Sequence, residues 1–213
     1  WDVAGPARRA RLAASLTALD ESLDGRLLVV AADPAHAVPQ VAHAAGAGAV
    51  HVSADAGPYG RRRDAAVARA LAAAGVAWVP TGTPYAIGPG TVRTAAGAPY
   101  AVFTPFLRAW RAHCRPGPAS RPGDGQVASV SWAQPPSGLD VAAVPACDPD
   151  AGGACVRLDP AGEAAARQRW QRVVATGLET YHEARDRPDL DGTSSLSAAL
   201  KFGEIHPRTL LAD

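Results

Sequence analysis

The chain has 213 residues, of which 47% are hydrophobic and 19% are charged, and its formal net charge is +1. This composition excludes an intrinsically disordered chain and a collagen-like repeat, and the balanced charge gives no overall attraction to nucleic acid. No apolar run reaches the roughly 18–20 residues that a membrane-spanning helix needs, so we expect a soluble protein.

Helical and strand patterns alternate in the first 80 residues. Helices are predicted over residues 6–23, 37–45 and 61–74, and short apolar strands over 26–32, 49–53 and 76–79. Strands that alternate with helices at this spacing indicate a parallel sheet with right-handed crossovers. We therefore predict that residues 1–115 form an α/β domain with a Rossmann-like parallel sheet.

The pattern changes after residue 80. A loop rich in proline and glycine, TGTPYAIGPGTVRTAAGAPY, is followed by a predicted helix over residues 102–113. Exposed backbone N–H groups in such a loop often line a ligand site. Residues 116–160 have the composition of an interdomain linker. One helix is predicted from about residue 160 to 182 and two short helices after it, so residues 161–213 begin a second, all-helical domain.

Common catalytic and metal-binding motifs are absent from the sequence. The six histidines are scattered without metal-ligand spacing, and neither a GxSxG, a GxGxxG nor a P-loop motif is present. Three cysteines, Cys114, Cys147 and Cys155, are too few and too irregularly spaced for a disulfide framework, which favours the cytoplasm. We expect no metal site and no catalytic residue of a hydrolase.

The cluster GPYGRRRD at residues 57–64 follows a predicted strand and opens a helix. In an α/β sheet this is the crevice in which ligands usually bind. The structural alternative is that the glycines form the turn, the arginines are a solvated face and Asp64 pairs with one of them. Taken alone, the cluster favours the structural alternative.

A second cluster, DGTSSLS at residues 191–197, places four hydroxyl side chains at a predicted helix start. Such hydroxyls can cap the helix, or they can form a cradle for a diphosphate together with backbone N–H groups. Upstream, Tyr181 could stack or donate a hydrogen bond, and Arg185 could pair with a phosphate. Their structural alternatives are an aromatic at the core edge and a partner for Asp186 or Asp189.

Three segments in this order resemble the DNA photolyase and cryptochrome family. They are GPYGRRRD (57–64), the loop TGTPYAIGPGTVRT (81–94) with VFTPFLRAW (102–110), and the stretch from Tyr181 to Arg208, YHEARDRPDLDGTSSLSAALKFGEIHPR. The first two segments resemble the family's antenna domain, and the third resembles the opening of its FAD-binding domain.

The resemblance implies a light-driven DNA-repair flavoprotein that acts on UV-damaged DNA and splits cyclobutane pyrimidine dimers with an electron from reduced FAD. It also implies a monomer and a second antenna chromophore, of deazaflavin or folate type, at the 57–64 turn and the 81–94 loop. Arg185 matches a position that contacts DNA phosphate. The positions that match FAD contacts are Tyr181, Thr193, Ser194, Ser195, Leu196 and Ser197.

The sequence departs from the family pattern in several places. Ser195 and Ala198 stand where the family usually has Arg and Pro, and the family's opening strand is not found. The catalytic half of the family's flavin domain would lie beyond Asp213, so we expect an inactive piece of a longer protein, with no catalytic residue of its own. Two alternatives remain: a cryptochrome-like blue-light photoreceptor, and a free-standing α/β nucleotide-binding module.

Overall fold

The computed structural model describes residues 5–113, 117–118, 129–134, 137, 141–144 and 159–213. These residues divide into two compact units. The first comprises the described part of Trp1–Val29 and Val141–Ile205 with Asp213, and the second that of Val30–Asp140 with His206–Ala212. The three cysteines and most of the expected linker lie outside the described residues. The domain boundaries at 115 and 160 therefore remain predictions.

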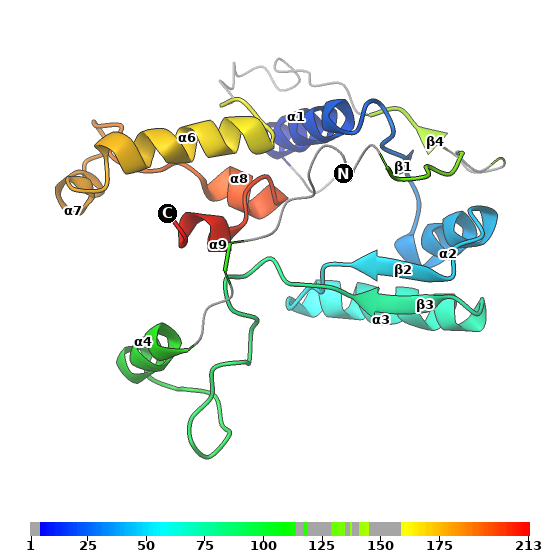
Figure 1. Cartoon of the computed structure of the whole chain (residues 1–213), viewed down its shortest axis with the longest axis horizontal. Coiled ribbons are helices and arrows are strands. Elements are labelled where there is room, and N and C mark those ends of the chain that lie inside the picture. Colours follow the sequence, from blue (N-terminus) through cyan, green and yellow to red (C-terminus); the bar gives the residue numbers. More distant parts are fainter. Residues whose placement is uncertain (1–4, 114–116, 119–128, 135–136, 138–140, 145–158) are drawn as a thin grey trace. The chain divides into compact units, whose positions relative to one another are not determined.

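A parallel strand pair connected by a helix organises the second unit (Figure 1). Strand β2 (Ala49–Val52) pairs in parallel with β3 (Ala77–Pro80), with Ala49 opposite Ala77 and Val52 opposite Pro80. Helix α3 (Pro58–Ala73) makes the crossover and runs alongside both strands, and α2 (Pro34–Ala44) packs against it. This arrangement confirms the predicted α/β class, since parallel strands need such a crossover.

The core of this unit lies where α2 and α3 meet the strands. Its buried members are Ala42, Val67, Leu71 and Val76, and Leu71 is fully buried. Partly buried side chains pack around them: Ala35, Val38, Ala47, Val50 and Trp78. The helix predicted over 37–45 begins earlier, at Pro34, because the Asp33 carboxylate accepts a hydrogen bond from the Ala35 N–H and caps it.

A long irregular segment follows β3, as the sequence predicts, and ends at α4 (Phe103–Ala112). The Arg93 guanidinium shapes it by donating to the carbonyls of Gly90 (2.8 Å) and Gly97 (2.9 Å). His206, the N-cap of α9 (Pro207–Leu210), also contacts this irregular segment. Its Nε2 lies 2.8 Å from the Thr83 carbonyl oxygen, and its Nδ1 accepts from the Arg208 N–H at 3.1 Å.

The first unit is mainly helical. It contains α1 (Pro6–Ser22), α6 (Glu163–Thr176), α7 (Tyr181–Ala184) and α8 (Ser197–Phe202). The two-residue strand β1 (Val29–Val30), at which the two units divide, pairs with β4 (Val141–Ala142). Small apolar side chains dominate the interior, which is formed by Ala10, Ala13, Ala166, Leu196, Ala199 and Ile205.

One predicted helix and one predicted strand are longer than the elements in the structure. The helix expected from 160 to 182 is interrupted: α6 ends at Thr176, and Gly177 donates its N–H to the Val173 carbonyl as the C-cap before α7 begins. Glycine is a weak helix former and a common terminator. The strand expected over 26–32 is reduced to Val29–Val30, because among the described residues only these two of the run pair with another strand.

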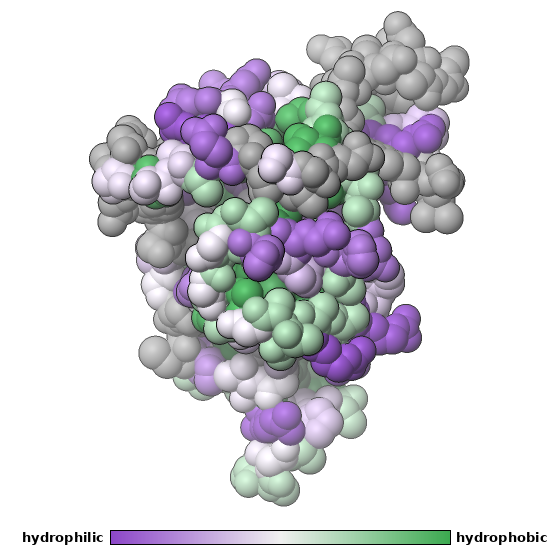
Figure 2. Space-filling view, turned by 90° about the vertical axis from the view of Figure 1, so that its right-hand side faces the viewer, coloured by the Kyte–Doolittle hydropathy of each residue, from purple (hydrophilic) through white to green (hydrophobic). Residues whose placement is uncertain are grey.

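Large apolar side chains remain exposed in both units, among them Phe103, Leu178 and Leu190. Figure 2 shows hydrophobic and hydrophilic residues interleaved on the face that it draws. Within the described ranges, no helix is long and apolar enough to cross a membrane.

A buried arginine connects three segments of the first unit. Arg11, on α1, forms an ion pair with Glu204, and the two side chains are only 10% and 5% exposed. Its Nη1 donates to the carbonyl of Asp159 at 2.8 Å, and Glu204 also accepts from the Ser15 hydroxyl. A charge pair this deeply buried is costly to break, because either partner alone would be left unpaired in a poorly solvated place.

We predict that Glu204→Gln lowers the free energy of unfolding by about 3 kcal/mol, since it leaves the Arg11 charge buried without its counter-ion. Urea denaturation of the chain measures this value. The matched control is Asp186→Asn, which removes the exposed pair with Arg185 and should change stability by less than about 1 kcal/mol. Equal effects of the two substitutions would contradict the prediction.

Candidate functional site

A cavity of about 430 Å³ opens between α6, α7 and the segment that precedes α8. This volume is in the range of small-molecule sites. Gly192 lets the segment approach α7 closely, because a Cβ at this position would lie 2.4 Å from the Ala184 Cβ. The lining residues are Arg169, Arg172, Val173, Thr176, Gly177, Thr180, Tyr181, Ala184, Leu190, Asp191, Gly192 and Thr193.

Two of the residues predicted to contact FAD, Tyr181 and Thr193, line this cavity together. Tyr181 begins α7 and is 42% exposed, so its ring is accessible. The side chain of Leu196 is 2% exposed and packs in the core, which leaves only its backbone for a ligand. Ser194, Ser195 and Ser197 follow Thr193 along the chain but are not among the lining residues.

The hydroxyl segment does not cap α8. The N-cap residue is Leu196, which makes no side-chain cap bond, and the Thr193 hydroxyl oxygen lies 3.4 Å from that of Ser195. Ser195 has φ 48°, in the left-handed region that non-glycine residues seldom adopt. The capping interpretation therefore does not account for these hydroxyls, and the strained backbone at Ser195 favours a functional role.

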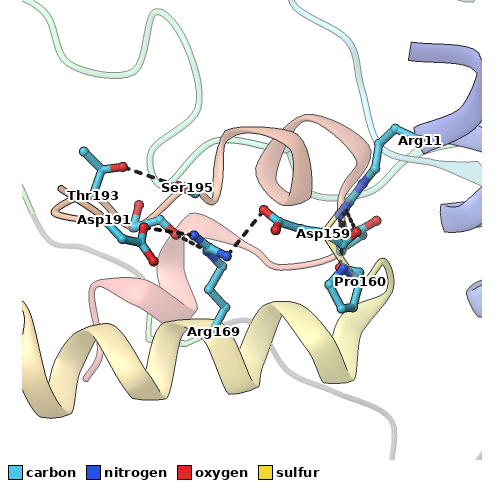
Figure 3. Close-up of polar contacts among 9 residues, drawn as sticks. Arg11, Asp159, Pro160, Arg169, Asp191, Thr193 and Ser195 are labelled. Carbon is cyan, nitrogen blue, oxygen red and sulfur yellow. Dashed lines mark hydrogen bonds and ion pairs between the residues drawn. The ribbon is translucent and has the colours of Figure 1, made fainter. Parts of the chain in front are cut away.

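Arg169 holds this segment in place (Figure 3). From α6 its Nε donates to the Ser194 carbonyl at 2.6 Å, while Nη1 lies 3.4 Å from Asp159 and Nη2 lies 3.7 Å from Asp191. Sequence reasoning missed this residue. The signal that could have found it is helical spacing, since residues 169, 172, 173 and 176 share one face of α6 and that face lines the cavity.

The donor chemistry of the cavity fits the group that the resemblance implies. Two guanidinium groups, three threonine hydroxyls and a phenol surround it, against a single carboxylate, that of Asp191. Such a set suits a phosphate-bearing nucleotide with sugar hydroxyls. FAD has these features, so Tyr181 and Thr193 are suitable contacts for it.

Arg185, predicted to contact DNA phosphate, does not line the cavity. Its guanidinium is 57% exposed and lies 3.4 Å from Asp186, one of the two partners that the structural alternative names. The other, Asp189, is held by Arg187 through bonds of 2.8 and 2.6 Å. These hydrogen bonds lower the pKa of the Asp189 carboxyl and raise the pKa of Arg187.

The 57–64 turn forms a separate cluster in the second unit. The Asp55 carboxylate accepts from the Gly57 N–H at 2.8 Å, and Asp64 accepts from the Asp55 N–H at 3.2 Å. Arg63 pairs with Asp64 at 2.7 Å, as the structural alternative for this cluster predicts. A Cβ on Gly60 would lie 2.0 Å from an Asp55 carboxylate oxygen, so the turn needs glycine there. The described residues hold no group of three or more potential metal ligands.

We predict that Gly60→Ala lowers the free energy of unfolding by about 1–2 kcal/mol, since the new methyl group displaces Asp55 from the turn. Thermal unfolding checks this effect. Gly48→Ala is the control, because a Cβ at Gly48 meets nothing within 4 Å, and it should leave the melting temperature nearly unchanged. A neutral Gly60→Ala would show that the turn adapts.

A further prediction concerns how the Arg187–Asp189 pair responds to a falling pH. Because Arg187 lowers the pKa of folded Asp189, the pair stabilises the fold fully above the unfolded-state pKa, and this contribution is lost as the pH falls through the folded-state pKa. A carbon-detected NMR titration should show the Asp189 midpoint below that of an ordinary aspartate. Arg187→Gln and added salt should both raise the midpoint, since both side chains of the pair are more than half exposed. An unchanged midpoint in Arg187→Gln would refute the assignment.

Comparison with known sequences identifies relatives of this chain. The family model for DNA photolyase matches residues 1–123. Deoxyribodipyrimidine photo-lyase of Synechococcus sp. strain PCC 6301 is 35% identical, over 94% of this chain and 42% of its own length. A 31.6 kDa protein encoded in the atpI 5′ region of Synechococcus sp. strain PCC 6716 is 37% identical, over 96% of this chain and 72% of its own length.

Solved structures with a similar fold include a photolyase and a cryptochrome. A bacterial class III photolyase from Agrobacterium tumefaciens superimposes with a TM-score of 0.69 and 25% identity, and the match covers 97% of this chain and 43% of that one. A cryptochrome of Synechocystis sp. PCC6803 gives 0.68 and 20%, over 97% and 44%. The chain thus spans less than half the length of these structures and of the Synechococcus photo-lyase. The family match and these similarities establish that the chain belongs to the DNA photolyase family.

Proposed function

We propose that this chain is part of a light-driven DNA-repair flavoprotein that splits cyclobutane pyrimidine dimers, and that the cavity beside α6 holds the diphosphate region of FAD. The observation that carries the proposal is the meeting of Tyr181 and Thr193, two matched FAD positions, on the wall of one cavity with phosphate-binding chemistry. The relative named deoxyribodipyrimidine photo-lyase supports the proposed reaction.

Bound FAD would supply the light-excited electron that splits the dimer. The residues of this chain would bind and orient it. The Tyr181 ring offers an accessible apolar face, and the Thr193 hydroxyl offers hydrogen bonds on the cavity wall, which the backbone of residues 194–197 continues beyond the lining residues. Arg169 would keep that backbone fixed through the Ser194 carbonyl.

Arg185 would bind the damaged DNA strand. Its guanidinium is exposed and has only a long 3.4 Å contact with Asp186, so a phosphate can replace that carboxylate at small cost. Contacts of this kind position the strand and do not read its sequence.

The second unit would hold the antenna chromophore. The arginine-rich turn at 57–64 follows β2, at the carboxyl end of a parallel pair, where α/β proteins bind ligands. The proposal includes a deazaflavin or folate group there, a cytoplasmic location and a monomeric state. The small number of cysteines supports the location.

A cryptochrome-like blue-light photoreceptor is the second candidate. The similarity of fold to the Synechocystis cryptochrome favours it. Both candidate proteins would bind flavin at the same site, but only the first would repair DNA.

The test uses a chimaera in which this chain replaces the matching part of the Synechococcus photo-lyase. We expect the purified chimaera to contain FAD and to repair a dimer-bearing oligonucleotide under blue light, while the chain alone repairs none. Tyr181→Ala should reduce the FAD content, because it removes the aromatic wall of the cavity. Arg185→Gln should keep the FAD and weaken DNA binding by about tenfold.

Each outcome separates the candidates. A chimaera that binds FAD but repairs no dimer would favour the photoreceptor. A folded chimaera without FAD, judged by circular dichroism, would refute the flavin proposal. Repair by the chain alone would contradict the expectation that it is inactive.

A further inference from the structure

One arginine on the cavity wall has no counter-ion among the residues that the structure describes. Arg172 lies one turn after Arg169 on α6 and lines the cavity, yet its guanidinium makes no hydrogen bond or ion pair with any described residue. Only its backbone is engaged, since its carbonyl accepts from the Thr176 hydroxyl at 2.9 Å. Arg172 is therefore a cation available to a ligand.

The neighbouring arginines of the same region differ in this respect. Each has a carboxylate within ion-pair distance: Arg167 with Glu163 (2.8 Å), Arg169 with Asp159 (3.4 Å), Arg185 with Asp186 (3.4 Å) and Arg187 with Asp189 (2.6 Å). Between residues 159 and 193, the chain thus places an acidic partner beside each of its other arginines. Arg172 is the exception among the arginines of this described stretch, and it lines the cavity.

The charge balance of the lining favours an anion. Two arginines and one aspartate line the cavity, and Asp191 is already within 3.7 Å of Arg169. One positive charge is left over, at Arg172. The hydroxyls of Thr180, Tyr181 and Thr193 on the same cavity can donate to phosphate oxygens, and a guanidinium can pair with two of those oxygens at once.

We propose that Arg172 is the phosphate-pairing cation of this cavity, and that it selects ligands with a nucleoside diphosphate group. The inference rests on the proposed flavin site and adds its specificity. It also gives a reason why Ser195 can stand where the resembled family usually has Arg: the positive charge comes from α6 instead of from the hydroxyl segment. Arg172 binds the ligand directly, while Arg169 only positions the segment.

Calorimetric titration of the chain with FAD, ADP, inorganic pyrophosphate and riboflavin tests this proposal. We expect Arg172→Gln to weaken binding of FAD, ADP and pyrophosphate by about tenfold, the usual order for one charged hydrogen-bonded pair. Riboflavin has no phosphate, so its affinity should not change. Arg172→Lys should retain part of the affinity, because an ammonium keeps the charge but not the bidentate geometry.

Arg167→Gln is the matched control. It removes one arginine from the same helix, but this arginine pairs with Glu163 and does not line the cavity. The Arg167→Gln variant should bind FAD, ADP and pyrophosphate with the affinity of the wild-type chain. Equal weakening in both variants would mean that net charge alone acts, and would overturn the proposal. Circular dichroism of all variants checks that α6 is retained.

The remaining outcomes separate this inference from the proposed function. Unchanged FAD and ADP binding in Arg172→Gln would overturn the role of Arg172 and leave the flavin site intact. Suppose instead that ADP and pyrophosphate binding depends on Arg172 but the chimaera takes up no FAD. This result would support the role of Arg172 and refute the flavin site. A wild-type chain that binds none of the phosphate probes would overturn the inference.

Discussion

One buried ion pair joins the segments of the first unit, the unit that contains the candidate cavity. Arg11 of α1 holds Glu204, directly after α8, and the backbone carbonyl of Asp159, shortly before α6. These two attachments join α1 to the chain just before α6, which lines the cavity, and just after α8, which follows the lining segment. A charge pair this deeply buried is costly to break, because either partner alone would be left unpaired.

The polar contacts of Arg169 then fix the segment that precedes α8. Arg169 binds the Ser194 carbonyl and lies near Asp191, so the backbone before α8 is fixed while the hydroxyls of Thr193 and Ser195 contact only each other. Rigid backbone with available side chains is the arrangement that preorganised binding requires. The division of roles is clear: one guanidinium serves the protein, and its neighbour at Arg172 is left for a ligand.

The sequence predicted what depends on local pattern. The alternation of helical patterns with the short apolar runs of β2 and β3 is a local signal, and it predicted the α/β class correctly. The extent of β1 was wrong, because an apolar run becomes a strand only where a partner strand meets it. Tyr181 and Thr193 could be named from a motif. Arg169 could not, since helix arginines are usually solvated and its partners Asp159 and Asp191 come from distant segments.

The two contacts of His206 have a consequence for the placement of a single hydrogen atom. Nδ1 accepts from the Arg208 N–H, so it carries no hydrogen, and Nε2 must carry the one that it donates to the Thr83 carbonyl. The ring is therefore the neutral Nε2–H tautomer. A doubly protonated imidazolium has no acceptor to offer the helix, and a serine could cap α9 but is too short to reach the loop. The imidazole thus links the start of α9 to the start of the long loop through one tautomer.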